Sequence, residues 1–257
     1  MDYLLICASA LVASGLTLFS GFGLGTLLMP AFALFFPVDV AVALTAVVHL
    51  FNNLFKLAML GKHADRAAVL RFGLPAIAAA YLGARALVWL SEMEPVATYQ
   101  LFSRDVQVMP VKLVVAVLMV AFALFELVPA FEKASFEKRY LPLGGVVSGF
   151  FGGLSGHQGA LRSAFLARCG LSRESFIATG VVIACLVDAS RISVYGARFL
   201  TAGVSENAPL LLAAVVSAFT GAFIGNRLVK KVTMRAMQVI VSVMLLGIAT
   251  ALGAGVL

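Results

Sequence analysis

The chain has 257 residues, of which 62% are hydrophobic and only 12% are charged, and its mean hydropathy is +1.04. Because soluble domains carry about 25% charged residues, this composition excludes a water-soluble domain and predicts a protein that lies in a bilayer. The net charge of +7 does not indicate nucleic-acid binding, since the Lys and Arg residues are scattered over loops and form no basic domain.

Ten apolar segments follow one another along the chain. They span residues 3–19, 25–37, 40–60, 71–90, 110–130, 141–154, 158–170, 173–196, 207–228 and 233–256. A membrane-spanning helix needs about 20 residues, so the second, sixth and seventh segments are too short to cross as straight helices. The first 19 residues lack a basic start and a cleavage site, and we expect them to stay as a membrane helix.

No cofactor is expected. The three cysteines, Cys7, Cys169 and Cys185, lie in apolar segments without metal-ligand spacing. No Walker-type phosphate-binding motif occurs, so we do not expect ATP to drive this chain directly or an ATPase subunit to be implied by it.

Glycine-rich stretches interrupt the apolar sequence once in each half. The first is Ser20-Gly21-Phe22-Gly23-Leu24-Gly25, and the second is Gly152-Gly153-Leu154-Ser155-Gly156-His157-Gln158-Gly159. Glycine lowers helix stability by roughly 1 kcal/mol relative to alanine, so each stretch predicts a broken helix. Such breaks persist in hydrocarbon only where protein or a water-filled cavity satisfies the backbone, and paired breaks indicate a transporter's binding site.

Short matches recur in the same order in both halves. Gly25-Thr26-Leu27 corresponds to Gly159-Ala160-Leu161, Asn53-Leu54-Phe55-Lys56 to Asp188-Ala189-Ser190-Arg191, and Gly83-Ala84-Arg85 to Gly225-Asn226-Arg227. We therefore expect an N-terminal membrane repeat over 1–130, a cytoplasmic linker over 131–140 and a C-terminal membrane repeat over 141–257. The fold class predicted is an all-α polytopic membrane protein in which each half contains a glycine-broken hairpin and three transmembrane helices.

The loop charges predict how the halves are related. Loops 61–71 and 131–140 are rich in Lys and Arg, whereas loop 91–109 has no basic excess. The positive-inside rule therefore places the first two loops in the cytoplasm and the third outside. Segment 71–90 then runs outward and its counterpart 207–228 runs inward, which makes an inverted repeat with both termini extracytoplasmic. The expected location is the bacterial cytoplasmic (inner) membrane.

Ionisable residues inside spans are costly, at about 2.5–3.5 kcal/mol each on insertion scales, and suggest function. Segment 40–60 presents four polar residues on one helical face: His49, Asn52, Asn53 and Lys56. Segment 173–196 presents Asp188 and Arg191, and the second break is followed by Arg162. Together with the helix N-termini that follow the breaks, these cations predict an anion site near the midplane.

The expected substrate-binding residues are Ser20, Gly21, Gly23, Gly25, Asn52, Asn53, Lys56, Ser155, Gly156, His157, Gln158, Gly159, Arg162 and Arg191. The candidates for proton coupling are His49, His157 and Asp188.

Simpler interpretations stay open for these residues. Lys56 can reach the cytoplasmic interface by snorkelling, and Asp188 and Arg191 can pair with each other within one helix. Arg162 can be a boundary residue that sets topology, and His49 can be a hydrogen-bonded buried histidine.

Three features of the sequence are typical of one known family. They are Ser20-Gly21-Phe22-Gly23-Leu24-Gly25-Thr26-Leu27-Leu28-Met29-Pro30, its counterpart from Gly145 to Gly153 and on to Thr179-Gly180, and the Gly-x-Arg pairs Gly83/Arg85 and Gly225/Arg227. In these features the chain resembles the TauE/SafE (TSUP) sulfite-exporter family. It implies a permease for small sulfur-containing anions such as sulfite, sulfoacetate and other sulfonates. The second repeat departs from the pattern, because it lacks a proline corresponding to Pro30 and carries His157, Gln158 and Arg162 instead.

The sequence therefore predicts a secondary transporter that moves such an anion by alternating access around a midplane site, with the lipid bilayer and a small anion as partners and with possible proton coupling. Two other classes remain as alternatives. One is an anion channel or a non-transporting membrane assembly factor. The other is an intramembrane hydrolase built on Ser155 and His157, which lack a clear third member.

Overall fold

The structure is a computed structural model that describes residues 2–20, 24–101, 104–128, 135–201, 208–228 and 234–257. Each predicted apolar segment corresponds to one helix. The helices are α1 (Asp2–Ser20), α2 (Leu24–Ala33), α3 (Val38–Leu60), α5 (Leu74–Ser91), α6 (Pro110–Leu127), α8 (Leu141–Ser155), α9 (Gly159–Leu166), α10 (Arg173–Thr201), α11 (Ala208–Leu228) and α12 (Met234–Gly253). A short α4 (Arg66–Ala68) and a π-helical turn (Val69–Gly73) lead into α5.

The helices have the length and composition of membrane segments. Within the described residues, three helical stretches are long and apolar enough to cross a membrane: Val38–Ala58, Arg66–Ser91 and Arg173–Gly196. Shorter apolar stretches lie in α1, α6, α11 and α12. These helices confirm the coarse fold class predicted from the composition, which is a predominantly helical multi-pass membrane protein.

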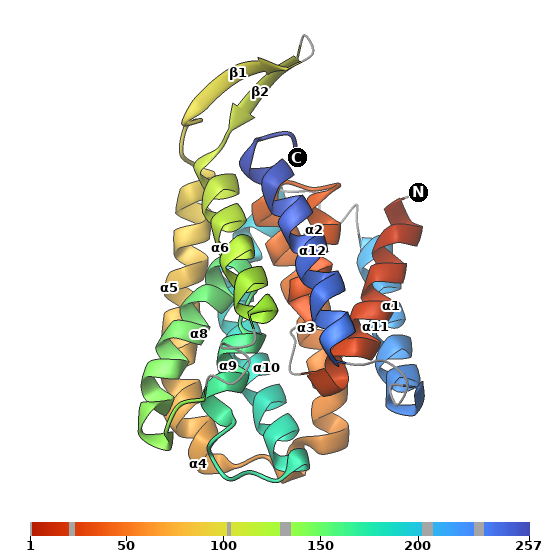
Figure 1. Cartoon of the computed structure of the whole chain (residues 1–257), viewed down its shortest axis with the longest axis vertical. Coiled ribbons are helices and arrows are strands. Elements are labelled where there is room, and N and C mark those ends of the chain that lie inside the picture. The colour runs from red at the N-terminus through yellow and green to blue at the C-terminus, as the bar shows by residue number, and fades with distance from the viewer. Residues whose placement is uncertain (1, 21–23, 102–103, 129–134, 202–207, 229–233) are drawn as a thin grey trace.

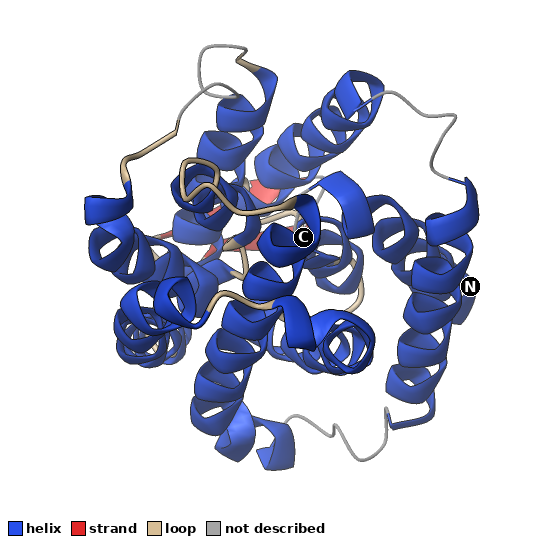
Figure 2. Ribbon diagram, turned by 90° about the horizontal axis from the view of Figure 1, so that it is seen from below, coloured by secondary structure: helices blue, strands red, loops and turns tan. Residues whose placement is uncertain are grey.

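The helices form one bundle in which partners come from opposite halves of the chain. Helix α5 packs along α8, α1 along α11, α3 along α10 and α6 along α12. Seen along the bundle from the end opposite the strands, the helices form a single cluster, and the two strands lie behind them (Figure 2). The two halves are therefore interleaved rather than folded as separate bodies.

Backbone contact between α5 and α8 depends on small residues. Gly145, Gly149 and Gly153 recur every four residues on α8, and a Cβ added at any of them would collide with a carbonyl oxygen of the helical segment 72–80. Gly83 of α5 has the same relation to the carbonyl of Phe150. Since lipid gives no hydrophobic drive for helices to associate, close packing through small residues is what holds such pairs together.

The structure also contains a β-hairpin that the sequence analysis did not predict. Strands β1 (Ala97–Leu101) and β2 (Arg104–Val108) pair antiparallel, with Tyr99 opposite Val106. The hydroxyl of Tyr99 donates to the carbonyl of Ala254 at 2.6 Å, which ties the hairpin to the C-terminal end of the chain. A signal for the hairpin exists in the sequence, since Ala97, Tyr99 and Leu101 in β1 and Val106 and Val108 in β2 alternate with polar residues.

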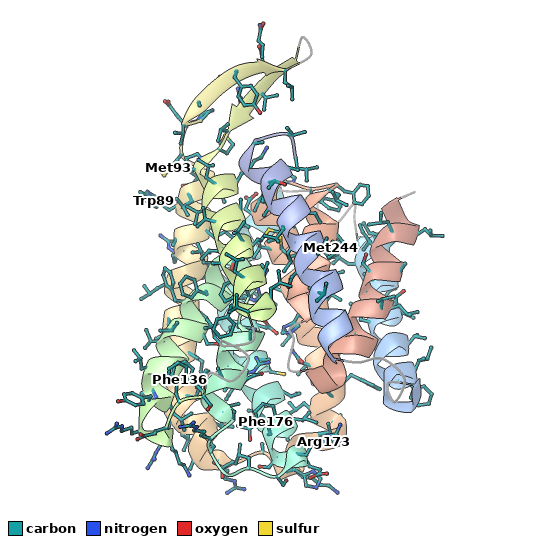
Figure 3. The ribbon with its side chains drawn as sticks, viewed as in Figure 1. Trp89, Met93, Phe136, Arg173, Phe176 and Met244 are labelled. Carbon is teal, nitrogen blue, oxygen red and sulfur yellow. The ribbon has the colours of Figure 1, made fainter. Side chains whose placement is uncertain are left out.

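The two ends of the bundle differ. The start of α1, the end of α12 and the β-hairpin lie at one end, and α4 and the segment between α9 and α10 lie at the other (Figure 1). Trp89 and Met93 are near the hairpin end, whereas Arg173 is at the opposite end (Figure 3). Segments 61–71 and 135–140, which contain Lys62, Arg66, Lys138 and Arg139, belong to the end opposite the hairpin.

The α5–α8 contact predicts a specific sensitivity to side-chain volume. Gly153→Ala places a Cβ against the backbone of Ala80 and Ala84, so we expect it to lower the apparent melting temperature in detergent, measured by a size-exclusion thermostability assay. Gly247→Ala on α12 is the matched control, because a Cβ there meets nothing within 4 Å and alanine favours helix by about 1 kcal/mol over glycine. Equal melting temperatures for the two variants would contradict close α5–α8 packing.

Candidate functional site

The second glycine-rich break ends α8 and starts α9 within the bundle. Gly156 has φ of 82°, in the left-handed region, and its N–H donates to the carbonyl of Gly152. The polypeptide resumes as a helix at Gly159 after Gln158. Residues 152–159 are all buried, so the polar groups of the broken backbone must find partners inside the protein.

Side chains of α10 provide several of these partners. Arg191 Nη1 donates to the carbonyl oxygen of Gly152 at 3.2 Å, and the hydroxyl of Tyr195 donates to the carbonyl oxygen of Gly153. Both carbonyls belong to the last turn of α8, where backbone donors run out; that of Gly152 accepts from the N–H of Gly156 as well as from Arg191. Arg191 and Tyr195, one turn apart on α10, therefore fasten the broken end of α8.

The carboxylate of Asp188 is the centre of the polar cluster. Its Oδ1 accepts from Arg191 Nε at 3.0 Å and Nη2 at 2.7 Å, and from Gln158 Nε2 at 3.2 Å. All of these groups are buried. The pairing within one helix that the spacing allowed is thus present, and the charge of Arg191 is balanced by Asp188.

The other oxygen of Asp188 faces helix α3. Its Oδ2 accepts from His49 Nδ1 at 2.6 Å and from Asn53 Nδ2 at 3.4 Å. Because a carboxylate oxygen only accepts, Nδ1 of His49 carries the hydrogen in this contact. One carboxylate therefore joins α3, α10 and the α8–α9 break.

Two further cations lie in the cluster without an acidic partner among the described residues. Lys56 is 6% exposed, so its ammonium lies inside the bundle rather than at an exposed helix end. Arg162 is half-buried, but its Nη1 is buried and donates no hydrogen bond, and its Nε would lie 3.4 Å from a Cβ added at Gly180 of α10. The charges of Lys56 and Arg162 repel each other.

Several buried polar atoms of the cluster also lack a hydrogen-bond partner. Besides Arg162 Nη1 they are Thr45 Oγ1, Asn52 Nδ2, His157 Nε2 and Gln158 Oε1. Leaving such a group unsatisfied costs about 1–3 kcal/mol, and native structures contain few of them. Around Lys56 and Arg162 these atoms provide hydrogen-bond donors and acceptors that could contact a small polar ligand.

The predicted site residues fall into two groups. The structure gathers Asn52, Asn53, Lys56, Arg191 and the residues of the second break into one cluster. Of the first break, Gly21 and Gly23 lie outside the described residues, Ser20 ends α1, and Gly25 lies in the first turn of α2. The side chain of Ser20 is not described, so the first break cannot be related to the cluster by contacts.

Other residues of the cluster were not singled out from the sequence. Phe122 of α6 stacks on His157, with ring centroids 5.2 Å apart and an interplanar angle of 8°. Thr45 lies one turn before His49 on α3 and belongs to the same polar face. Thr45 could have been found from its place on the polar face of α3. Phe122 could not, because a phenylalanine in an apolar helix does not stand out in the sequence.

A separate pocket lies at the hairpin end. It has a volume of about 710 Å³ and is lined by residues that include Asp105, Met109, Lys112 and Val256. Its one lysine faces one aspartate, and none of its lining residues belongs to the buried cluster.

A polytopic helical bundle with a broken-helix polar site in its interior defines a membrane transporter architecture. Residues 6–252 match the family described as sulfite exporter TauE/SafE. The chain therefore belongs to the TauE/SafE family of membrane transporters, as the sequence resemblance indicates. None of the curated proteins matches the chain.

The Asp188 contacts predict how the cluster responds to loss of charge. Removing one partner of a buried ion pair costs about 3–5 kcal/mol, because the other charge is left uncompensated. We therefore expect Asp188→Asn to lower the melting temperature strongly and the double variant Asp188→Asn/Arg191→Gln to recover part of the loss. Melting temperatures in detergent measure the cycle, and losses that simply add would contradict the pairing.

Proposed function

We propose that this protein is a secondary permease, not an enzyme, which moves a small sulfur-containing anion such as sulfite, sulfoacetate or another sulfonate across the bacterial cytoplasmic membrane. The observation that supports it most directly is a pair of cations, the buried Lys56 and the half-buried Arg162, which form no salt bridge with an acidic side chain in the described part of a chain of this family. A positively charged interior without a counter-charge is suited to hold an anion.

The proposal includes an inverted repeat, and the helix contacts support it. If α1, α3, α5 and α6 correspond to α8, α10, α11 and α12, a two-fold axis exchanges the pair α5–α8 with the pair α11–α1. Both pairs are closely packed. Glycine approaches backbone in each, since Gly83 meets the carbonyl of Phe150 and Gly221 meets that of Leu11.

A helix that lies next to this two-fold axis must pack against the equivalent helix of the other repeat. This is the relation of α3 to α10 and of α6 to α12. Asn53 and Asp188 hold equivalent positions in the repeat, and Asn53 Nδ2 donates to Asp188 Oδ2 at 3.4 Å. The approximate axis would therefore pass beside this contact, within the polar cluster.

We assign the hairpin end of the bundle to the extracytoplasmic side, with both termini. The support is the clustering of loop Lys and Arg residues at the opposite end. Trp89, which is 62% exposed, then lies near the outer interface, where tryptophan is enriched.

A hydrolase is disfavoured by the contacts of its proposed nucleophile. Ser155 Oγ donates to the carbonyl of Phe151 at 3.1 Å, so its hydrogen is directed to backbone. His157 Nδ1 lies 3.2 Å from Ser155 Oγ but 3.0 Å from the carbonyl oxygen of Ser155. Since a carbonyl oxygen only accepts, Nδ1 carries the hydrogen in that contact and is unsuited to act as a base toward Ser155.

Proton coupling is proposed at His49. It contacts Asp188 of α10 directly, feels the charges of Arg191 and Arg162, and shares its helical face with Asn53. Export of an anion is favoured by an inside-negative potential by about 2.3 kcal/mol per charge per 100 mV and needs no coupling ion. Uptake needs one, and gain or loss of a proton at His49 would alter the link between α3 and α10.

Flux into liposomes tests the function. Purified protein should carry sulfite or sulfoacetate with saturation and counterflow, since a permease exposes its site alternately. Ser155→Ala should retain flux, and His49→Gln should reduce the dependence of flux on pH if transport is proton-coupled. The absence of flux for any sulfur oxyanion or sulfonate would contradict the proposal, and flux without saturation or counterflow would favour a channel.

A further inference from the structure

The ionisable groups of the polar cluster do not balance in charge. Within the described bundle the cluster holds the buried cations Lys56 and Arg191, the half-buried Arg162 and a single carboxylate, Asp188. Arg191 gives two N–H groups to Asp188 at 3.0 and 2.7 Å, so these two charges neutralise each other. With both histidines neutral, the cluster retains two positive charges, one on α3 and one on α9.

These two charges are placed so that neither relieves the other. Lys56 and Arg162 repel each other. Asp188 attracts Arg162, but its oxygens already accept from five donor groups of Arg191, Gln158, His49 and Asn53. Burying an unpaired charge is much more costly than burying a neutral polar group. Negative charge placed near both cations would therefore stabilise the arrangement.

Unsatisfied polar atoms indicate where that negative charge would lie. Arg162 Nη1 and Asn52 Nδ2 are buried donors without acceptors. Asn52 is one turn before Lys56 on the same face of α3, with its own Oδ1 accepting from Ser14 Oγ at 3.0 Å. The amide nitrogen of Asn52 and the ammonium of Lys56 thus form one donor group on α3, and the guanidinium of Arg162 forms a second on α9.

We propose that the substrate of this site is a small dianion, whose two negative charges are matched by Lys56 and Arg162. The inference rests on the proposed permease function and names the charge of the anion that it binds. It favours the sulfite dianion, or a sulfonate that also bears a carboxylate, over a sulfonate with a single charge. In this arrangement Arg191 is a positioning residue, which holds Asp188 and the broken end of α8.

Two ligands of similar size separate these possibilities. Sulfoacetate and 2-hydroxyethanesulfonate share a sulfonate, but the first carries a carboxylate where the second carries a hydroxymethyl group. Calorimetric titration of the purified full chain at neutral pH should give at least about 10-fold tighter binding of sulfoacetate. Lys56→Gln and Arg162→Gln should each remove most of this preference by weakening sulfoacetate, with little change for 2-hydroxyethanesulfonate.

Control variants keep the outcome interpretable. Arg168→Gln removes an exposed arginine just after α9 and should leave both affinities unchanged. Lys56→Arg and Arg162→Lys keep the charge and should retain the preference, which a purely structural role would not predict. Equal binding of the two ligands, or a preference that survives both glutamine variants, would overturn the dianion assignment while leaving the permease intact. Binding of neither ligand would overturn the permease proposal together with it.

Discussion

The carboxylate of Asp188 determines how the interior of this protein is arranged. It receives hydrogen bonds from α3 through His49 and Asn53, from its own helix through Arg191, and from the α8–α9 break through Gln158. A buried carboxylate is stable only when its lone pairs are met in this way. Three segments that are distant in the sequence are thus held together by one small group, near the middle of the bundle.

The arrangement of the broken helix follows from this constraint. With Asp188 fixed, Arg191 can reach the carbonyl of Gly152 and Tyr195 that of Gly153, so side chains of α10 hold the end of α8. The same contacts use the charge of Arg191 for structure. Our proposal therefore assigns anion binding to Lys56 and Arg162, for which the described residues provide no salt bridge. Because α3, α9 and α10 meet here, a change in ligand or proton occupancy can be transmitted to the packing between the halves.

Much of the fold could be predicted because membrane helices are marked by long apolar runs, and all ten predicted segments contain a helix. The polar face of α3 and the glycine breaks likewise identified most of the residues of the cluster. The contacts between them could not be predicted, since His49 meets Asp188 only through packing of α3 on α10. The spacing of Asp188 and Arg191 fits both an internal pair and an anion site, and only the tertiary contacts distinguish these. Phe122 left no signal in hydropathy, and the apolar alternation of the β-hairpin is short beside the long helical runs.

The central claim is that an anion binds between Lys56 and Arg162 inside the bundle. A high-resolution structure of the protein with sulfoacetate at saturating concentration tests it most directly. The account predicts ligand density in contact with both side chains, next to Asn52 and the α8–α9 break. Density confined to the pocket beside Lys112 at the hairpin end, or an interior in which Lys56 and Arg162 remain without a ligand, would contradict it.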